Sequence, residues 1–325
     1  MKPVLNESIS IHPTTSHLTA ANYWDHFLAR WAVNREGHRL EPGLYALGNP
    51  TPDSPVFVTA NYTLSFDALR SALAGIDGYI LVLDTKGINV WCAAGKGTFG
   101  TDELVLRIQA TNLAEVVHHR VLILPQLGAP GMAAHEVKQR SGFKVEYGPV
   151  RATDIPQYLT TRQATPEMRR VHFTLRDRLV LIPVELVGAL LPLLIALTIG
   201  LLLHSWAATA AILAGVVLFP ILLPWLPTHD LSAKGFLLGT VVALPFVLTA
   251  FTSHADASWW LRALWALVYL LVILPITAFL TLNFTGSTTY TSRSGVRREI
   301  FTYIPTMAWM FGIGVVLNIV LVFIH

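Results

Sequence analysis

The chain has 325 residues, of which 53% are hydrophobic and 13% charged, and its formal net charge at pH 7 is +3. A soluble domain ordinarily carries roughly 25% charged residues, so this composition excludes a protein that lies wholly in water. The small positive charge gives no basis for nucleic-acid binding. The single cysteine of the sequence excludes internal disulfides and a self-contained four-cysteine cluster, and it fits a reducing compartment.

Charged residues are concentrated in the first half of the chain. Residues 1–178 hold most of them, and from Leu179 onward they nearly vanish within long apolar runs. We therefore expect an N-terminal extension over residues 1–55 that packs on a soluble domain. The soluble domain itself would cover residues 56–178, and a transmembrane domain would cover residues 179–325.

Five apolar runs in the last part are long enough to cross a membrane as helices, which takes roughly 20 residues each. They cover residues 179–203, 206–226, 235–252, 262–284 and 303–324. Three prolines crowd the end of the second run. Lysine and arginine gather before the first run and in the second–third and fourth–fifth connections. The positive-inside rule then predicts a multi-pass protein of the cytoplasmic membrane, with its N-terminal domain in the cytoplasm.

An aromatic stripe marks a predicted helix over residues 22–35. Its members, which recur at helical spacing, are Tyr23, Trp24, Phe27, Leu28 and Trp31. We expect this stripe to face the core. Residues 42–55 are rich in proline and glycine, which predicts an extended, turn-rich approach to the soluble domain.

Strands and helices alternate from Val56 onward. Strands are predicted at 56–60, 79–83, 121–124 and 143–147, with helices at 65–74, 101–112 and 131–141 between them. This alternation is typical of a Rossmann-like α/β domain with a mostly parallel sheet covered on both faces. Ligands of such sheets bind beyond the carboxyl ends of the strands. The segments 61–62, 84–97 and 125–131 would therefore line one crevice.

The segment 89–96, Asn-Val-Trp-Cys-Ala-Ala-Gly-Lys, carries the only thiol. A buried structural cysteine is the plain interpretation, because free cysteine is among the most buried residue types. Asn89, however, is a competent N-cap and would place Cys92 in the first turn of a short helix. The helix N-terminus and Lys96 would both favour thiolate over thiol. The small residues 93–95 leave room for a flat partner, so Cys92 suits a nucleophile or one axial bond to a metal held by a macrocycle.

A second pattern overlaps this segment. Residues 95–100 match G-x-G-x-x-G, the dinucleotide-binding fingerprint. That fingerprint also needs a strand directly before it and an acidic residue about 20 positions later. The nearest strand ends near Leu83, and the third strand is followed by Pro125 and Gln126. Dinucleotide binding is therefore not predicted.

The segment 89–96 resembles the signature of the corrinoid protein of microbial mercury methylation. Segments 59–62, 83–87 and 124–131 resemble the same family, and the apolar C-terminal part matches it in layout. More distantly, the soluble domain is similar to the corrinoid-binding portion of the corrinoid iron–sulfur protein large subunit of the acetyl-CoA pathway. The resemblance covers the soluble core from about Val56 to Arg178.

This resemblance implies a Rossmann-like domain that binds base-off cobalamin, with the Cys92 thiolate as the catalytic group and lower axial ligand of cobalt. It also implies a ferredoxin-like partner with 4Fe–4S clusters as electron donor, and a methyl donor from folate-dependent one-carbon metabolism. The implied cofactor-binding residues are Thr59, Asn61, Asn89, Val90, Trp91, Cys92, Ala93, Ala94, Gly95, Lys96, Gln126, Leu127, Gly128, Ala129 and Gly131.

Three functions follow as hypotheses. The first is a membrane-anchored, corrinoid-dependent methyltransferase that converts Hg(II) to methylmercury, in which a donating thiolate makes the methyl group electron-rich. The second is a membrane-anchored corrinoid methyl carrier of one-carbon metabolism, with mercury as an adventitious acceptor. The third, from another class, is a transporter with a regulatory soluble domain.

Overall fold

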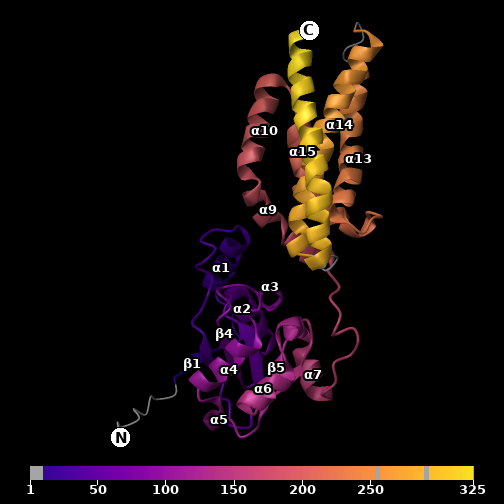
Figure 1. Ribbon diagram of the computed structural model, residues 1–325. Coiled ribbons are helices and arrows are strands. Elements are labelled where there is room, and N and C mark those ends of the chain that lie inside the picture. The colour runs from indigo at the N-terminus through magenta and orange to yellow at the C-terminus, as the bar shows by residue number, and fades with distance from the viewer. Residues whose placement is uncertain (1–9, 253–256, 289–292, 325) are drawn as a thin grey trace, which may run out of the picture. The chain divides into compact units, whose positions relative to one another are not determined.

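The computed structural model describes residues 10–252, 257–288 and 293–324, and the chain forms two compact units (Figure 1). The first unit is Met1–His172 and the second is Phe173–His325. The sequence predicted that the boundary between the soluble and the transmembrane domain follows residue 178. In the structure α8 (Leu175–Leu179) belongs to the second unit, where the buried guanidinium of Arg178 donates a 3.0 Å hydrogen bond to the carbonyl of Pro220.

The first unit is built on a six-stranded sheet with the order β1-β2-β4-β3-β5-β6. The four predicted strands are confirmed, and β4-β3-β5-β6 are mutually parallel. The strands are β1 (Ile11–Thr14), β2 (Gly43–Leu47), β3 (Val56–Ala60), β4 (Gly78–Leu83), β5 (Val121–Leu124) and β6 (Lys144–Tyr147).

Two strands come from the segment expected to be an extension. β2 pairs antiparallel with β4, with Leu44 opposite Leu81, and β1 pairs parallel with β2. Residues 11–47 therefore extend the sheet itself rather than only packing on it. The sequence did not predict β2, because proline and glycine are frequent around it. Its pairing partner β4 also lies more than 30 residues later in the chain, so no local pattern indicated the pairing.

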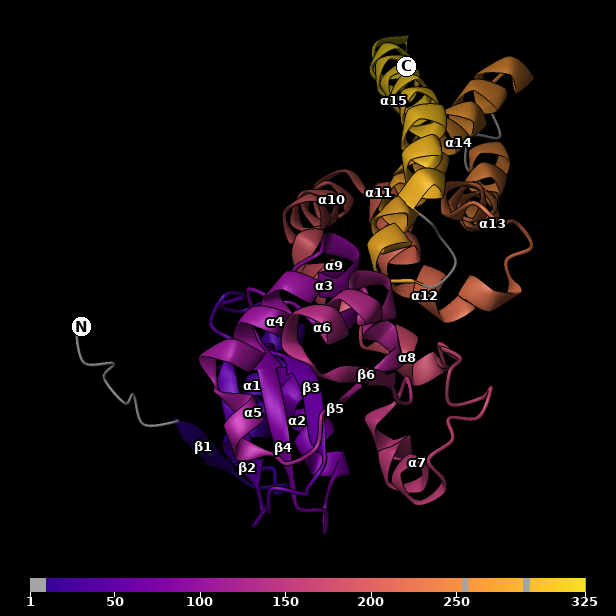
Figure 2. The same ribbon diagram turned by 60° about the horizontal axis from the view of Figure 1, so that its bottom comes forward.

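Helices cover both faces of the sheet (Figure 2). One apolar core lies under α3 (Val90–Lys96), α4 (Thr101–Ala110), α5 (Leu113–Val116) and α6 (Ala134–Ser141). The other lies under α2 (Thr63–Ala72) and α7 (Ile155–Thr161), which follows a 3-10 turn at Ala152–Asp154. β4 serves both, because Leu81 and Leu83 point into the first core and Ile80 and Val82 into the second. The predicted α/β class is confirmed.

The prediction that the aromatic stripe faces the core is wrong. The stripe lies on α1 (Ala20–Arg30) and the turn after it, and α1 has no buried residue. Tyr23 and Trp24 are 62% and 61% exposed, and Phe27 and Trp31 are also exposed.

Polar side chains hold α1 to the unit instead. Asp25 accepts a hydrogen bond of 2.6 Å from the Thr63 hydroxyl, and His26 Nε2 lies 2.8 Å from the buried Asp67 carboxylate. Helical periodicity alone identified an amphipathic helix correctly but could not tell which of its faces points inward.

The second unit is helical. Within its described residues, four stretches are long and apolar enough to cross a membrane: Ala207–Trp225, Leu231–Thr252, Trp259–Gly286 and Ser294–Phe323. A fifth predicted span, over 179–203, is not one straight helix, because its two halves meet at an angle of 72°. The elements are α9 (Ile182–Gly188), α10 (Leu190–Leu203), α11 (Ala207–Leu213), a π-helical turn (Ala214–Leu218), α12 (Phe219–Leu222), a 3-10 turn (Leu223–Trp225), α13 (Leu231–Thr252), α14 (Trp259–Leu282), a 3-10 turn (Asn283–Gly286) and α15 (Arg293–Ile324).

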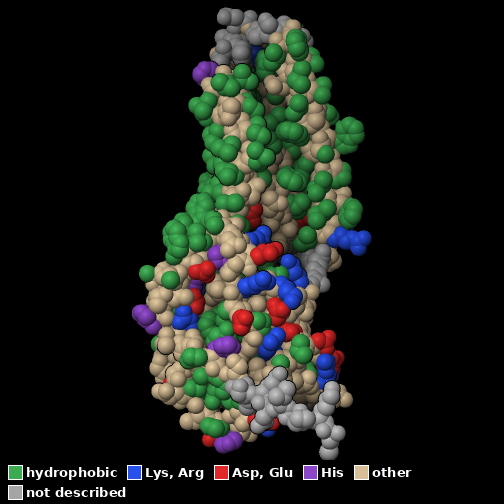
Figure 3. All heavy atoms as spheres, turned by 90° about the vertical axis from the view of Figure 1, so that its left-hand side faces the viewer, with side chains coloured by type: hydrophobic (Ala, Val, Ile, Leu, Met, Phe, Trp, Pro, Cys, Tyr) green, Lys and Arg blue, Asp and Glu red, His purple; other side chains and the backbone are tan. Residues whose placement is uncertain are grey.

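Small residues bring α13 and α14 close together. A Cβ on Gly235 would lie 2.5 Å from the Cα of Ala278, and one on Gly239 would lie 3.0 Å from the Cα of Leu274. These two glycines form a G-x-x-x-G pair, a pattern that packs helices in membranes. On the side that Figure 3 shows, hydrophobic side chains cover most of this unit, whereas most of the charged side chains lie on the α/β unit.

The attachment of α1 is expected to weaken as the pH rises. Both ring nitrogens of His38 face acceptors, Asp25 at 2.7 Å and the Val33 carbonyl at 2.6 Å, so both must donate and the imidazolium form fits best. Burial opposes this charge, but the two hydrogen bonds outweigh it and raise the pKa of His38 above its ordinary 6.5.

Because the pKa is raised on folding, the stabilisation is complete below pH 6.5 and is lost as the pH rises through the raised value. Amide-exchange protection factors of α1 should fall over that window in the native protein. In His38→Gln they should be low and independent of pH. Constant protection of α1 across the window in the unmodified chain would contradict this account.

Candidate functional site

The predicted short helix that carries the cysteine is confirmed as α3. The side-chain oxygen of Asn89 accepts a 2.9 Å hydrogen bond from the backbone N–H of Cys92, which makes Asn89 the N-cap. Gly97 ends the helix with φ of 86°, a left-handed conformation that glycine adopts without strain. Cys92 therefore lies in the first turn of a helix with both ends defined.

The two faces of α3 differ. Val90, Ala93 and Ala94 are buried in the core, whereas Cys92 is a free, partly exposed thiol. Gly95 and Lys96 follow it by three and four residues, so they share its face. The plain interpretation of Cys92 as a buried core residue is therefore wrong. The outer face of α3 presents a thiol beside a residue without a side chain.

The loop after β5 packs closely against α3. It forms the 3-10 helix η1 (Gln126–Gly131). A Cβ on Gly131 would lie 2.2 Å from the carbonyl oxygen of Phe99 and 3.0 Å from the Cα of Ala94, and one on Gly128 would lie 2.5 Å from the Phe99 ring. These two glycines, predicted from the resemblance as cofactor-binding residues, are explained in the structure by this close packing, which sets the position of α3.

Asn61 has an internal role. Its side chain is buried, and its oxygen accepts hydrogen bonds from the N–H groups of Thr85 and Gly87, each at 3.0 Å. Its amide also donates to Asp84 at 3.3 Å. Asn61 therefore shapes the loop that leads from β4 to α3.

The carboxylate of Asp84 steadies the same loop. Partial burial would raise its pKa, but hydrogen bonds from the side chain and backbone N–H of Lys86 lower it below the ordinary value. Asp84 thus stays ionised and holds the turn that precedes Asn89.

A cavity of about 310 Å³ adjoins α3. It lies at the carboxyl ends of β3 and β5, the two strands on either side of the point where the order of the parallel strands reverses. Open α/β sheets bind ligands at this switch point. The predicted residues that the structure brings together in its wall are Thr59, Asn89, Val90, Trp91 and Leu127.

Part of the wall was not predicted from the sequence. Ser65, Ala68 and Leu69 of α2 line the cavity, as do residues of the segment 148–155 after β6. Ligands of parallel sheets bind beyond the carboxyl ends of the strands. Applied to β6, the fourth strand predicted from the sequence, this rule would have identified the segment after it. The place of α2 depends on how that helix packs on the sheet.

The other predicted residues lie outside this wall. Ala93 and Ala94 are core residues, and Cys92, Gly95 and Lys96 belong to the outer face of α3. The Gln126 side chain accepts a 2.6 Å hydrogen bond from Arg169, and Ala129 is partly buried in η1.

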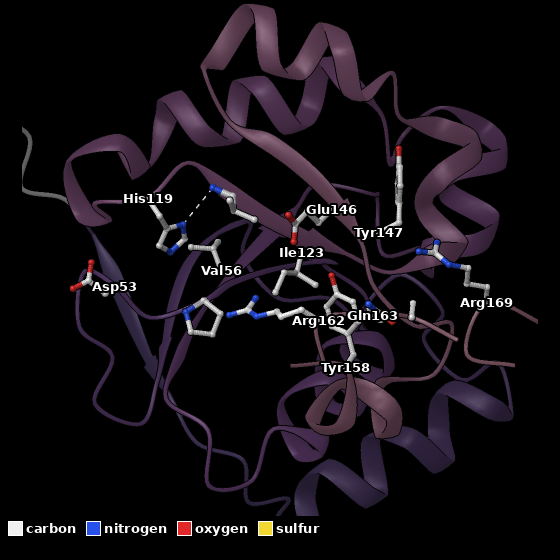
Figure 4. A pocket seen from close by; sticks show the side chains of 13 residues that line it. Asp53, Val56, His119, Ile123, Glu146, Tyr147, Tyr158, Arg162, Gln163 and Arg169 are labelled. Carbon is white, nitrogen blue, oxygen red and sulfur yellow. Dashed lines mark hydrogen bonds between the residues drawn. The ribbon is translucent and has the colours of Figure 1, made fainter. Parts of the chain in front are cut away.

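A larger cavity, of about 860 Å³, lies toward the amino ends of β3 and β5 (Figure 4). His119 in its wall accepts the N–H of Val121 on Nδ1 at 3.2 Å and lies with Nε2 2.9 Å from the Ser54 carbonyl, which fits a neutral, structural imidazole. Burial, and to a lesser degree the Glu146 carboxylate, raise the pKa of Tyr158 above its ordinary value. None of the predicted site residues lines this cavity.

Comparison with known proteins bears on the α/β unit. Residues 31–159 match the family described as CO dehydrogenase/acetyl-CoA synthase delta subunit. The acetyl-CoA decarbonylase/synthase complex subunit gamma of Archaeoglobus fulgidus is 37% identical over 123 residues, which are 37% of this chain and 26% of that protein. The same subunit of Methanopyrus kandleri is 35% identical over 127 residues, 38% of this chain and 27% of that protein.

These similarities have defined limits. The chain spans about a quarter of the length of the curated relatives it matches. The family match begins at residue 31, earlier than the resemblance in the sequence had placed it, and so includes β2. It ends at residue 159, before the helical unit begins. The comparisons support the more distant of the two resemblances and do not support the specific one to mercury methylation.

The N-cap of α3 makes a testable contribution to the site. Replacing Asn89 by alanine removes the side-chain acceptor for the Cys92 N–H and should cost about 1 kcal/mol of local stability. Amide exchange of residues 90–93 should then be faster in Asn89→Ala. Asn89→Ser keeps a capping oxygen and should exchange nearly as slowly as the native chain. Equal exchange in all three proteins would show that the cap does not hold α3.

Proposed function

We propose that the chain is a membrane-anchored corrinoid protein that takes part in methyl transfer, with the Cys92 thiolate as the lower axial ligand of cobalt. The observation that carries the proposal is the position of Cys92. It is a free, partly exposed thiol in the first turn of α3, which Asn89 caps, and the neighbouring residues 89–91 line the switch-point cavity.

The residues present fit such a group. A planar macrocycle needs one axial donor and an unobstructed surface, and the outer face of α3 offers the sulfur of Cys92 with Gly95 one turn away. A bound corrinoid would supply a cobalt centre that carries the methyl group, and an electron-rich thiolate on cobalt would favour release of the methyl with its bonding electrons. Thr59, Trp91 and Leu127 of the adjoining cavity would hold its periphery.

We propose two possible destinations for the methyl group, one-carbon metabolism and Hg(II), and a different observation supports each. The names of the relatives, subunits of the acetyl-CoA decarbonylase/synthase complex, favour a carrier in one-carbon metabolism over mercury methylation. The segment 89–96 favours Hg(II), because it resembles the mercury-methylation signature over all eight residues. Hg(II) is an electrophile, and a methyl group made electron-rich by a thiolate suits it.

The membrane part of the proposal is supported by the second unit. Large apolar side chains there face outward, including Leu202, Trp309 and Phe323 at 74%, 73% and 86% exposure. Water disfavours so much apolar surface, whereas lipid accommodates it. The distribution of lysine and arginine predicts that the α/β unit faces the cytoplasm.

The proposed partners are a ferredoxin-like protein with 4Fe–4S clusters and a methyl donor from folate-dependent one-carbon metabolism. The 325 residues include one cysteine, too few for a cluster of their own. Reducing equivalents for cobalt would therefore come from another protein.

Spectroscopy of the purified chain tests the axial ligand. The native protein should carry a corrinoid whose visible and magnetic spectra indicate sulfur on cobalt. Cys92→Ser and Cys92→Ala should lose that signature, while far-UV circular dichroism shows that the fold is kept. A native chain without corrinoid would favour the transporter hypothesis, and identical spectra for all three proteins would exclude Cys92 as the ligand.

A pair of cell assays separates the two acceptors. If Hg(II) is the physiological acceptor, Cys92→Ser should lower methylmercury formation by more than about 100-fold, beyond the 10–100-fold that loss of an outer-shell metal partner costs. Growth that depends on one-carbon metabolism should then be unchanged. Impaired growth together with the loss of methylmercury would instead support the one-carbon carrier.

A further inference from the structure

In α1 polar side chains point into the unit and aromatic side chains point outward, which is the reverse of an ordinary amphipathic helix of a soluble domain. We infer that its aromatic face, defined as Tyr23, Trp24, Phe27 and Trp31, lies in the headgroup region of the membrane that the chain's own helices cross. This inference rests on the membrane part of the proposed function and is independent of the corrinoid.

The aromatic face is one continuous surface. The rings of Trp24 and Phe27 are stacked, with centroids 5.3 Å apart and planes 16° apart, and the Phe27 and Trp31 centroids are 6.0 Å apart. All four side chains are exposed. A contiguous exposed apolar patch of this kind on a folded unit indicates a contact with something outside it.

Contacts on the opposite face of α1 prevent the helix from rotating to bury its aromatic face. His26 lies 2.8 Å from Asp67, whose carboxylate is also bound at 2.6 Å by Arg70. Arg70 in turn donates to the carbonyls of Thr15 and His17, just before α1, at 2.6 and 2.7 Å. Asp67 and Arg70 are both buried, so turning the helix would leave charges with fewer partners in a low-dielectric surrounding.

The chemistry of the aromatic face favours lipid as its occupant. Tyrosine and tryptophan carry a polar group on a large apolar ring and concentrate at membrane interfaces. Arg30 and Arg35, at the end of α1 and just after it, are exposed and would attract anionic headgroups. A short helix with aromatic rings on one face and arginine beside them is typical of an interfacial membrane helix.

The chain also keeps the α/β unit close to a bilayer. Residues 162–174 join the end of α7 to the start of α8, and even fully extended they span about 45 Å. Such a tether makes contact with the membrane an intramolecular event with a high effective concentration. A modest apolar face is then enough to keep α1 at the surface.

Photo-crosslinking in lipid nanodiscs tests this contact on the full chain with Cys92 intact. The photoreactive residue p-benzoylphenylalanine is placed at Phe27, at Leu106 on the exposed side of α4, or at Phe279 on α14. The probes are nanodiscs of zwitterionic lipid with and without anionic lipid. Mass spectrometry then identifies lipid adducts and crosslinked peptides.

Phe27 and Phe279 should both give lipid adducts, and Leu106 should give none. Adducts at Phe27 should increase with anionic lipid, and Arg30→Glu with Arg35→Glu should remove that increase. Lipid adducts at Phe279 without any at Phe27 would overturn the inference. Crosslinks from Phe27 to peptides of the helical unit or of a second copy would overturn it too and would identify that occupant. A lack of adducts at Phe279 would contradict the membrane proposal itself.

Discussion

The outward position of Cys92 depends on how α3 is held. The Asn89 side chain caps its first turn, Gly97 ends it, and Gly131 lets η1 come within contact of Phe99 and Ala94 on its inner side. These constraints place a residue type that is usually buried on the partly exposed face of a short helix with both ends defined. The proposed chemistry depends on this arrangement, because a large flat cofactor that binds at the surface could not reach a sulfur enclosed in the apolar core.

The same physical inversion occurs twice in the molecule. In the helical unit, Glu299 is buried and accepts hydrogen bonds from the N–H and hydroxyl of Ser232 at 3.0 and 3.1 Å, while large apolar side chains face outward. In α1, Asp25 and His26 face inward and the aromatic rings face outward. Both the membrane proposal and the inferred lipid contact of α1 rest on this reversed arrangement of polar and apolar groups.

The comparisons and the motif inform different questions. The match over residues 31–159 covers strands β2 to β6, α3 and the cavity beside it, so it concerns what the α/β unit can bind. The eight-residue motif concerns instead the proposed role of the partly exposed Cys92 thiol and the methyl acceptor proposed for it. The helical unit begins at Phe173, after the last matched residue, so the match gives no information about it.

Local patterns in the sequence determined the parallel strands β3 to β6, the helices between them, the cap at Asn89 and the apolar helices, because each depends on neighbouring residues. Tertiary structure decided the rest. It paired β2 with a distant strand, and it placed Asn61 under the loop and Ser65 in the cavity wall. It also turned the aromatic side of α1 outward. Periodicity reports that a helix has two unlike faces, but only the partners at Thr63 and Asp67, distant in sequence, select the face that points inward.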